Sequence, residues 1–230
     1  MTEAAPVSWD LLLPTMPHRH DQMCDLLAEI DRQWQPGLGV LIYRDNMRRA
    51  GNASYGKWQD LEEASRADYT SFIADDDWIA PDYVARVMEA LEGKPDYVGF
   101  GCRYTVNGQP QMPVENSLRH GRWENSAEML YRDIVHHNPI RRELALLATW
   151  VTGTQEADRV WAADLRATGQ VKTEAWIPEE MYYYQETNDS SGTGNSWTNW
   201  HGGLPQPVPE SEIQPIPSYP WLTVRDEAFA

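Results

Sequence analysis

The first half of the chain alternates short apolar runs with stretches of helical periodicity, and this alternation constrains the fold most. Four apolar runs predict buried strands, at 9–13, 38–43, 69–74 and 97–104. Apolar residues at three- and four-residue spacing predict a helix over 23–34, and further helices are expected over 57–67 and from Pro81. Strands that alternate with helices indicate βαβ units, so we expect an α/β fold with a mostly parallel sheet flanked by helices.

The second half is less regular. Helices are expected over 140–148 and 157–168, strands over 171–176 and 181–185, and a hairpin turn at Asn107-Gly108. From Thr187 on, Gly, Ser, Asn and Pro dominate, which suits a lid or an extended tail held by Trp197, Trp200 and Trp221. We divide the chain into a first half (1–105), a second half of the same domain (106–186) and the lid or tail (187–230).

Composition narrows the class of protein. The formal net charge of −16 disfavours a protein that grips nucleic acid through its phosphates. The two cysteines, Cys24 and Cys102, form neither a disulfide framework nor a metal signature. We find no signal-peptide pattern and no apolar run of membrane-spanning length, so we expect a cytoplasmic protein.

Polar residues follow three of the expected strands at the point where each ends. Pro14-Thr15 follows the first strand, Asp45 the second, and Asp75-Asp76-Asp77 the third. Ligands of open parallel sheets bind beyond the carboxyl ends of the strands. The sequence therefore predicts a ligand site at this edge.

Three consecutive aspartates repel one another unless a cation lies among them. Mg²⁺ and Mn²⁺ bind one or two carboxylates together with substrate phosphates and water. We expect Asp75, Asp76 and Asp77 to hold such an ion against a diphosphate. The alternative is an acidic helix start, but Pro81 and Asp82 indicate that the helix begins later.

A family resemblance becomes specific here. Gly56-Lys57, followed by Tyr69 to Tyr83 with the three aspartates inside it, resembles the nucleotide-sugar core of the inverting family 2 glycosyltransferases. This resemblance implies the GT-A fold, a DxD-type motif with Mn²⁺ or Mg²⁺, and a nucleotide-sugar donor, with a UDP-sugar expected first. The chain departs from the family pattern at Ala74, where many relatives have Asp, and at Trp58-Gln59, where many have Arg-Asn.

The resemblance also implies roles for single residues. Asp76 is the expected principal metal ligand, Asp75 lies near ribose and metal, and Asp45 meets the nucleobase or ribose. Lys57 is expected among the residues that bind the nucleotide-sugar donor. Residues 1–105 are accordingly the expected donor-binding half, and 106–186 the acceptor and catalytic half. The turn Pro14-Thr15, together with Arg19, borders the base.

A carboxylate is expected as the general base that takes the proton of the acceptor hydroxyl. Glu156 to Ala162 resembles the family segment in which an acidic pair opens a helix below the acceptor site, and it aligns Asp158 with the base. Glu156 remains the alternative, and a plain helix-start carboxylate is the non-catalytic interpretation. Whether His137 or His201 contacts metal or phosphates stays open.

Several functions are compatible with these features. The main hypothesis is an inverting, metal-dependent transfer of a sugar to a hydroxyl on a glycan or metabolite. A phage-type enzyme that glycosylates a hydroxylated DNA base is an alternative, against which the net charge argues. Further alternatives are a nucleotidyltransferase and a non-catalytic carbohydrate-binding protein that uses its 11 Trp and 11 Tyr residues.

Overall fold

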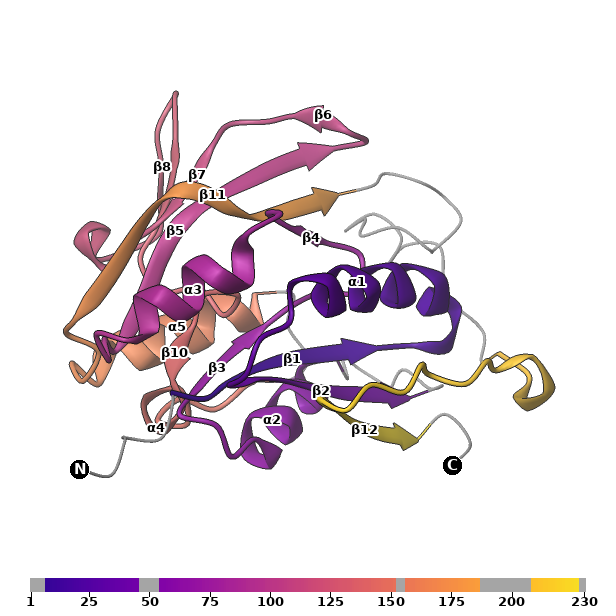
Figure 1. The fold of residues 1–230 in the computed structure, drawn as a ribbon. Helices are drawn as coiled ribbons and strands as arrows, with labels where there is room; N and C mark the ends of the chain where they lie inside the picture. Colours follow the sequence, from indigo (N-terminus) through magenta and orange to yellow (C-terminus); the bar gives the residue numbers. More distant parts are fainter. Residues whose placement is uncertain (1–6, 46–53, 152–155, 187–207, 228–230) are drawn as a thin grey trace, which may run out of the picture.

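The computed structural model describes residues 7–45, 54–151, 156–186 and 208–227. The expected alternation in the first half is confirmed (Figure 1). Its strands are β1 (Trp9–Thr15), β2 (Leu38–Asp45), β3 (Tyr69–Phe72), the short β4 (Trp78–Ile79) and β5 (Tyr97–Val106). Its helices are α1 (His20–Gln33), α2 (Ser54–Ala64) and α3 (Tyr83–Leu91).

The strands of the described ranges join one sheet, whose central part is parallel. β1 lies between β2 and β3 and is parallel to both. The two-residue β10 (Ile140–Arg141) runs antiparallel between β3 and β5, so β5 points the same way as β3. The carboxyl ends of β1, β2, β3 and β5 therefore face one edge of the sheet, where a ligand site is expected.

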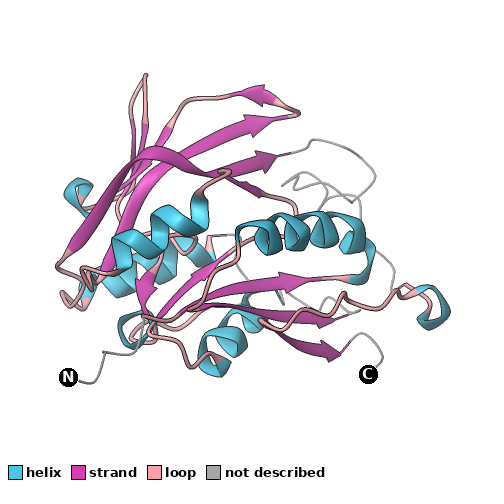
Figure 2. Cartoon of the chain, viewed as in Figure 1, coloured by secondary structure: helices cyan, strands magenta, loops and turns pink. Residues whose placement is uncertain are grey.

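Helices cover both faces of this sheet because its central strands are apolar on both sides (Figure 2). Trp9, Leu11 and Leu13 of β1 belong to the core that also contains residues of α1 and α3. Leu12 belongs to a second core, which includes Leu61 of α2 and residues of α5 (Ala157–Ala167). A strand buried on both faces reads as a continuous apolar run, as 11–13 does.

Beyond β5 the sheet continues as short strands. Asn107 and Gly108 form the expected hairpin, with φ of 50° and 75°, between β5 and β6 (Gln109–Pro110). The extension comprises β7 (Val114–Asn116), β8 (Glu124–Asn125) and β9 (Leu130–Arg132).

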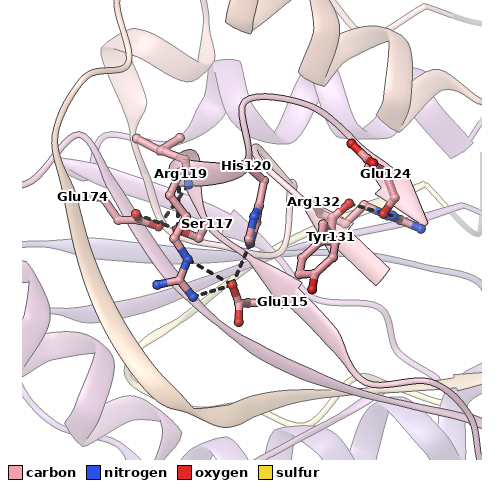
Figure 3. A network of polar contacts seen from close by, with 9 residues as sticks. Glu115, Ser117, Arg119, His120, Glu124, Tyr131, Arg132 and Glu174 are labelled. Atoms are coloured by element: carbon pink, nitrogen blue, oxygen red, sulfur yellow. Dashed lines mark hydrogen bonds and ion pairs between the residues drawn. The ribbon is translucent and has the colours of Figure 1, made fainter. Parts of the chain in front are cut away.

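Polar contacts fasten this extension to the main sheet (Figure 3). The carboxylate of Glu115 accepts hydrogen bonds from Arg119 and from His120, at 3.0 Å and 2.6 Å. Glu174 accepts a hydrogen bond from the hydroxyl of Ser117 at 2.8 Å. Because Glu174 begins β11 (Glu174–Glu186), this second contact ties the extension to a strand that pairs with β5, whereas the Glu115 bonds lie within the extension.

Two expectations for the second half are wrong. The helix expected over 140–148 is reduced to α4 (Arg142–Ala145), because Ile140 pairs with Thr70 and Tyr97 and so enters the sheet. The strands expected over 171–176 and 181–185 are replaced by the single strand β11, which begins only at Glu174 and whose register against β5 shifts between Ile177 and Tyr182. The helix expected over 157–168 is confirmed as α5, and Gly169 follows it with φ of 63°.

Part of the expected tail completes the sheet. After a short 3-10 helix, η4 (Glu210–Glu212), the strand β12 (Leu222–Glu227) pairs with β2 in parallel at the edge. The indole of Trp221 donates a hydrogen bond to Asp31 of α1 at 3.0 Å. Trp197 and Trp200 lie outside the described residues. Within the described ranges, every helix is too short or too polar to cross a membrane.

The carboxyl group of Glu62 gives the first testable prediction. Its side chain is 1% exposed and accepts a hydrogen bond from the indole of Trp150 at 3.0 Å. Burial raises the pKa of Glu62 to about 8, whereas a Glu in the unfolded chain titrates near ~4.3. The folded state therefore binds the proton more tightly, and this group makes stability fall as pH rises between these two values.

We expect Glu62→Gln to remove this slope, which is about 1.4 kcal/mol per pH unit at most, while the amide oxygen still accepts the indole hydrogen bond. Urea denaturation at pH 5, 7 and 9 measures it. The matched control is Glu63→Gln, at an exposed neighbouring position. Parallel stability-versus-pH curves for the wild type and Glu62→Gln would contradict the buried, protonated carboxyl.

Candidate functional site

The carboxyl ends of β1, β2 and β3 bring most of the expected donor-binding residues into one polar network. The ammonium group of Lys57, on α2, lies 3.2 Å from the carboxylate of Asp45 and donates to the backbone carbonyl of Thr15 at 3.0 Å. The hydroxyl of Thr15 donates to Asp75 at 2.6 Å. Pro14 precedes Thr15 and is half-buried. Burial lowers the pKa of Lys57, and its contact with Asp45 opposes that shift.

Arg19 extends this network to the second aspartate. It lies in the short 3-10 helix η1 (Pro17–Arg19) between β1 and α1, and its side chain is 14% exposed. Nη1 lies 2.7 Å from an oxygen of Asp75 and 2.7 Å from an oxygen of Asp76. Burial opposes the charge of the guanidinium, but the neighbouring carboxylates outweigh it and raise the pKa of Arg19. One cation thus partly neutralises two adjacent acids.

Asp76 has the least satisfied carboxylate of the cluster. Its side chain is 5% exposed and forms an ion pair with Arg19, but neither oxygen accepts a well-aligned hydrogen bond from the described residues. Burial raises the pKa of Asp76 to about 6, although Arg19 opposes the shift. Within the part of the chain that the structure describes, Oδ2 of Asp45 also has no donor. Buried oxygens without donors are costly, so these positions suit a ligand that supplies a cation or a donor group.

Asp77 differs from Asp76 because the protein satisfies both of its oxygens. The hydroxyl of Tyr182 donates to Oδ2 at 2.7 Å, and the backbone N–H of Gln185 donates to Oδ1 at 2.8 Å. Burial raises the pKa of Asp77 well above its usual range. Its assignment as a metal ligand stays a prediction, and in this structure its carboxylate fastens the loop to β11.

The residues present fit a hard divalent cation whose remaining ligands are supplied by a bound substrate. Among the described residues, no three His, Cys, Asp or Glu side chains converge as a ready-made metal site. Asp76 and the adjacent Asp75 offer carboxylate oxygens at one rim, with unused acceptor capacity on Asp76. Mg²⁺ and Mn²⁺ are commonly bound in this way, by one or two carboxylates with phosphate and water as the other ligands.

The two adjacent histidines lie beside the end of β3, and their rings contact each other with 5.4 Å between centroids. The carbonyl of His136 accepts a hydrogen bond from Phe72, the last residue of β3, at 2.8 Å. The ring of His136 packs against Trp58 at 4.6 Å, whereas that of His137 stacks on Tyr182 at 4.4 Å. Burial lowers the pKa of both, to about 3 for His136, so both rings are neutral. A metal or phosphate contact of His137 stays untested, and His201 lies outside the described residues.

The two candidate bases differ in their surroundings. Glu156 is exposed and pairs with Arg159 at 3.3 Å. Asp158 accepts a hydrogen bond from the backbone N–H of Arg159 at 2.8 Å, and burial raises its pKa. The described contacts do not join either carboxylate to the aspartate cluster, so the catalytic assignment of Asp158 and Glu156 stays a prediction.

A stack of rings nevertheless connects α5 to α2, the helix that carries Lys57. Trp161, one turn after Asp158, stacks on Trp150 at 4.8 Å. Trp150 contacts Trp58, which follows Lys57 on α2, at 4.7 Å. The helix that begins with the candidate base and the helix that carries Lys57 therefore pack into the same core, on one face of the sheet.

Sequence analysis missed Tyr182 and Gln185. Both lie in an expected strand, 181–185, so their element was partly recognised. Their contact with Asp77 depends on how β11 lies beside β4 and β5, a pairing between residues about one hundred positions apart. A local pattern carries no signal for that register.

Comparisons with known proteins place this geometry on a known fold. No protein family matches the chain, and no curated protein resembles it in sequence. Structures of S. aureus TarS, a glycosyltransferase of the GT-A type, share its fold. TarS 1–349 in complex with UDP-GlcNAc gives a TM-score of 0.60 at 10% identity, over 80% of this chain and 60% of that one. TarS 1–349 in complex with UDP gives 0.58 at 11% identity, over 78% and 60%.

These matches confirm the expected fold class, a GT-A type α/β fold with a mostly parallel central sheet flanked by helices. The chain spans about 60% of the length of the TarS 1–349 structures. Identity of 10–12% shows shared architecture and does not show membership of family 2, which stays a prediction.

Arg19 gives the second testable prediction. Removing one partner of a buried ion pair leaves uncompensated charge and costs roughly 3–5 kcal/mol. We expect Arg19→Ala to destabilise the metal-free protein and Mn²⁺ to restore part of the loss, because the ion takes over neutralisation of Asp75 and Asp76.

Thermal unfolding with and without MnCl₂ measures this. The control is Arg32→Ala, which removes an exposed guanidinium paired with Glu29. An equal shift by Mn²⁺ in Arg19→Ala and in the wild type would argue against a shared cation position.

Proposed function

We propose that this protein is a metal-dependent glycosyltransferase that takes a sugar from a nucleotide-diphosphate sugar, a UDP-sugar first among them. The observation that carries the proposal is the network from Asp45 to Asp76, which ends in a buried carboxylate without an aligned donor at the ligand edge of a GT-A fold. The similar TarS structures were obtained in complex with UDP-GlcNAc and with UDP, which favours this class of donor.

Each part of the network has a role in donor binding under this proposal. Oδ2 of Asp45, which has no donor among the described residues, accepts a hydrogen bond from the nucleobase or ribose, while Lys57 holds Asp45 and the Thr15 turn in place. Asp76, with Asp75, holds Mn²⁺ or Mg²⁺. The bound ion would neutralise the charge that develops on the departing nucleoside diphosphate.

Transfer then needs a base on the acceptor side. Asp158 takes the proton of the acceptor hydroxyl. At the same time the acceptor oxygen bonds to the anomeric carbon, and the bond from that carbon to the diphosphate oxygen breaks. Attack from the face opposite the leaving group inverts the anomeric centre. Burial raises the pKa of Asp158, which makes it a stronger base than an ordinary aspartate. Glu156, which is exposed and paired with Arg159, is the alternative base.

The acceptor is a hydroxyl group of a glycan, a metabolite or a modified DNA base. The net charge of −16 disfavours a DNA acceptor, because phosphates would be repelled. Analysis of the reaction products distinguishes a glycosyltransferase from a nucleotidyltransferase and from a protein that binds sugar without catalysis. Release of UDP with transfer or hydrolysis of the sugar supports a glycosyltransferase; release of pyrophosphate from a nucleoside triphosphate supports the rival enzyme.

Asp76→Asn tests metal-dependent donor binding. Calorimetry of UDP and UDP-GlcNAc with and without MnCl₂ is expected to show binding only with metal, and the variant should weaken it about hundredfold or more, since even outer-sphere partners cost 10–100-fold. The control Asp82→Asn removes an exposed carboxylate six residues further along. Unchanged affinity in Asp76→Asn would refute the metal assignment.

Asp158→Asn tests the base. An amide cannot accept the hydroxyl proton, so transfer or donor hydrolysis should fall about 10²–10⁴-fold, while calorimetry shows donor affinity within twofold of wild type. Glu156→Gln, in the same turn, serves as the comparison. Full activity of Asp158→Asn combined with loss in Glu156→Gln would move the role to Glu156.

A further inference from the structure

The loop that carries Asp75 and Asp76 is a tight turn whose two ends are anchored on a different strand. The turn runs from Ala74 to Asp77, and the N–H of Asp77 donates to the carbonyl of Ala74 at 3.2 Å. β4 follows directly, and it pairs antiparallel with β11 through Ile79 and Tyr182. The two carboxylates thus stand between β3 and β4, beside the middle of β11.

A single hydroxyl group bridges the ends of this turn. The oxygen of Tyr182 accepts a hydrogen bond from the N–H of Ala74 at 3.2 Å and donates one to Asp77 at 2.7 Å. The other oxygen of Asp77 accepts the N–H of Gln185 at 2.8 Å. Three hydrogen bonds therefore fasten the turn to β11.

We propose that Tyr182 is a positioning residue for Asp75 and Asp76, and that Asp77 acts in the same latch by fixing the turn to β11. The inference rests on the proposed function, in which those two carboxylates hold the cation. It assigns different roles to three consecutive acids: two face the ligand edge, and the third holds the turn in place.

The hydroxyl of Tyr182 is itself held rigidly. The side chain is 2% exposed, and its ring lies nearly parallel to that of His137, at 8° and 4.4 Å between centroids. Its backbone belongs to the pairing of β11 with both β4 and β5. The turn therefore cannot shift on Tyr182 without disturbing a strand, which is the property a positioning group needs.

The latch also opposes the electrostatic repulsion between the carboxylates of the turn. Asp75 and Asp76 share the single guanidinium of Arg19, so an unrestrained turn lowers its energy by moving its carboxylates apart. Groups that orient a metal ligand without touching the metal commonly contribute 10–100-fold to metal affinity. Removing the hydroxyl while keeping the ring should expose this contribution.

A buried tyrosine elsewhere provides a matched control. Tyr69 begins β3 and is also 2% exposed, and its hydroxyl donates to the carbonyl of Pro95 at 2.6 Å. Tyr69→Phe removes one buried hydrogen bond and Tyr182→Phe removes two, so both variants should melt at a lower temperature than wild type, and Tyr182→Phe at the lower of the two. Only Tyr182→Phe removes a contact with the turn.

The first measurement is titration of Mn²⁺ in the presence of UDP, with free Mn²⁺ read by electron paramagnetic resonance. Tyr182→Phe should bind Mn²⁺ about tenfold or more weakly than wild type, and Tyr69→Phe within twofold of it. Wild-type affinity in Tyr182→Phe, or equal weakening in both variants, overturns the positioning role.

A second measurement needs no ligand and separates the two proposals. In the metal-free protein, exchange of the Ala74 amide, followed by NMR, should be faster in Tyr182→Phe than in wild type or Tyr69→Phe. A wild type that binds no Mn²⁺ with UDP overturns the proposed function and the role in metal binding together; faster exchange would then identify a latch that is only structural. If the Ala74 amide exchanges equally fast in Tyr182→Phe and in wild type, the latch itself is overturned, whether or not the protein binds Mn²⁺.

Discussion

Buried negative charge at the carboxyl edge of the sheet is the constraint on which the rest of the site depends. The carboxylate of Asp45 is compensated by Lys57, and that of Asp75 by Arg19 and a hydroxyl. Asp76 shares only the ion pair of Arg19 and has no aligned donor among the described residues. Since an unsatisfied buried carboxylate is expensive, its retention here is best explained by a ligand that completes it.

The architecture of the first half follows from local patterns. The run at 11–13 is apolar at every position because β1 is covered on both faces, and the 3–4 spacing in α1 matches its buried face of Met23, Leu26, Leu27 and Ile30. Strand ends are also local features. Thr15, Asp45 and Asp75 were therefore placed together from sequence, because parallel strands deliver their carboxyl ends to one edge.

The remainder depends on pairings that no local pattern encodes. Ile140 lies in an apolar stretch that reads as helical, but it fills the gap between β3 and β5. β12 joins the edge of β2 from a segment rich in turn residues, and Arg44 and Asp226 pair there across some 180 positions. Tyr182 reaches Asp77 only through the register of β11. Pairings that bridge such distances are decided by the assembled sheet.

The most direct test of the central claim is anomalous diffraction from crystals grown with Mn²⁺ and UDP. The account predicts a manganese peak in direct contact with the Asp76 carboxylate and with the diphosphate, with the base or ribose beside Asp45. A manganese peak and a nucleotide bound away from the edge formed by β1, β2 and β3, with Asp76 contacting neither, would contradict it.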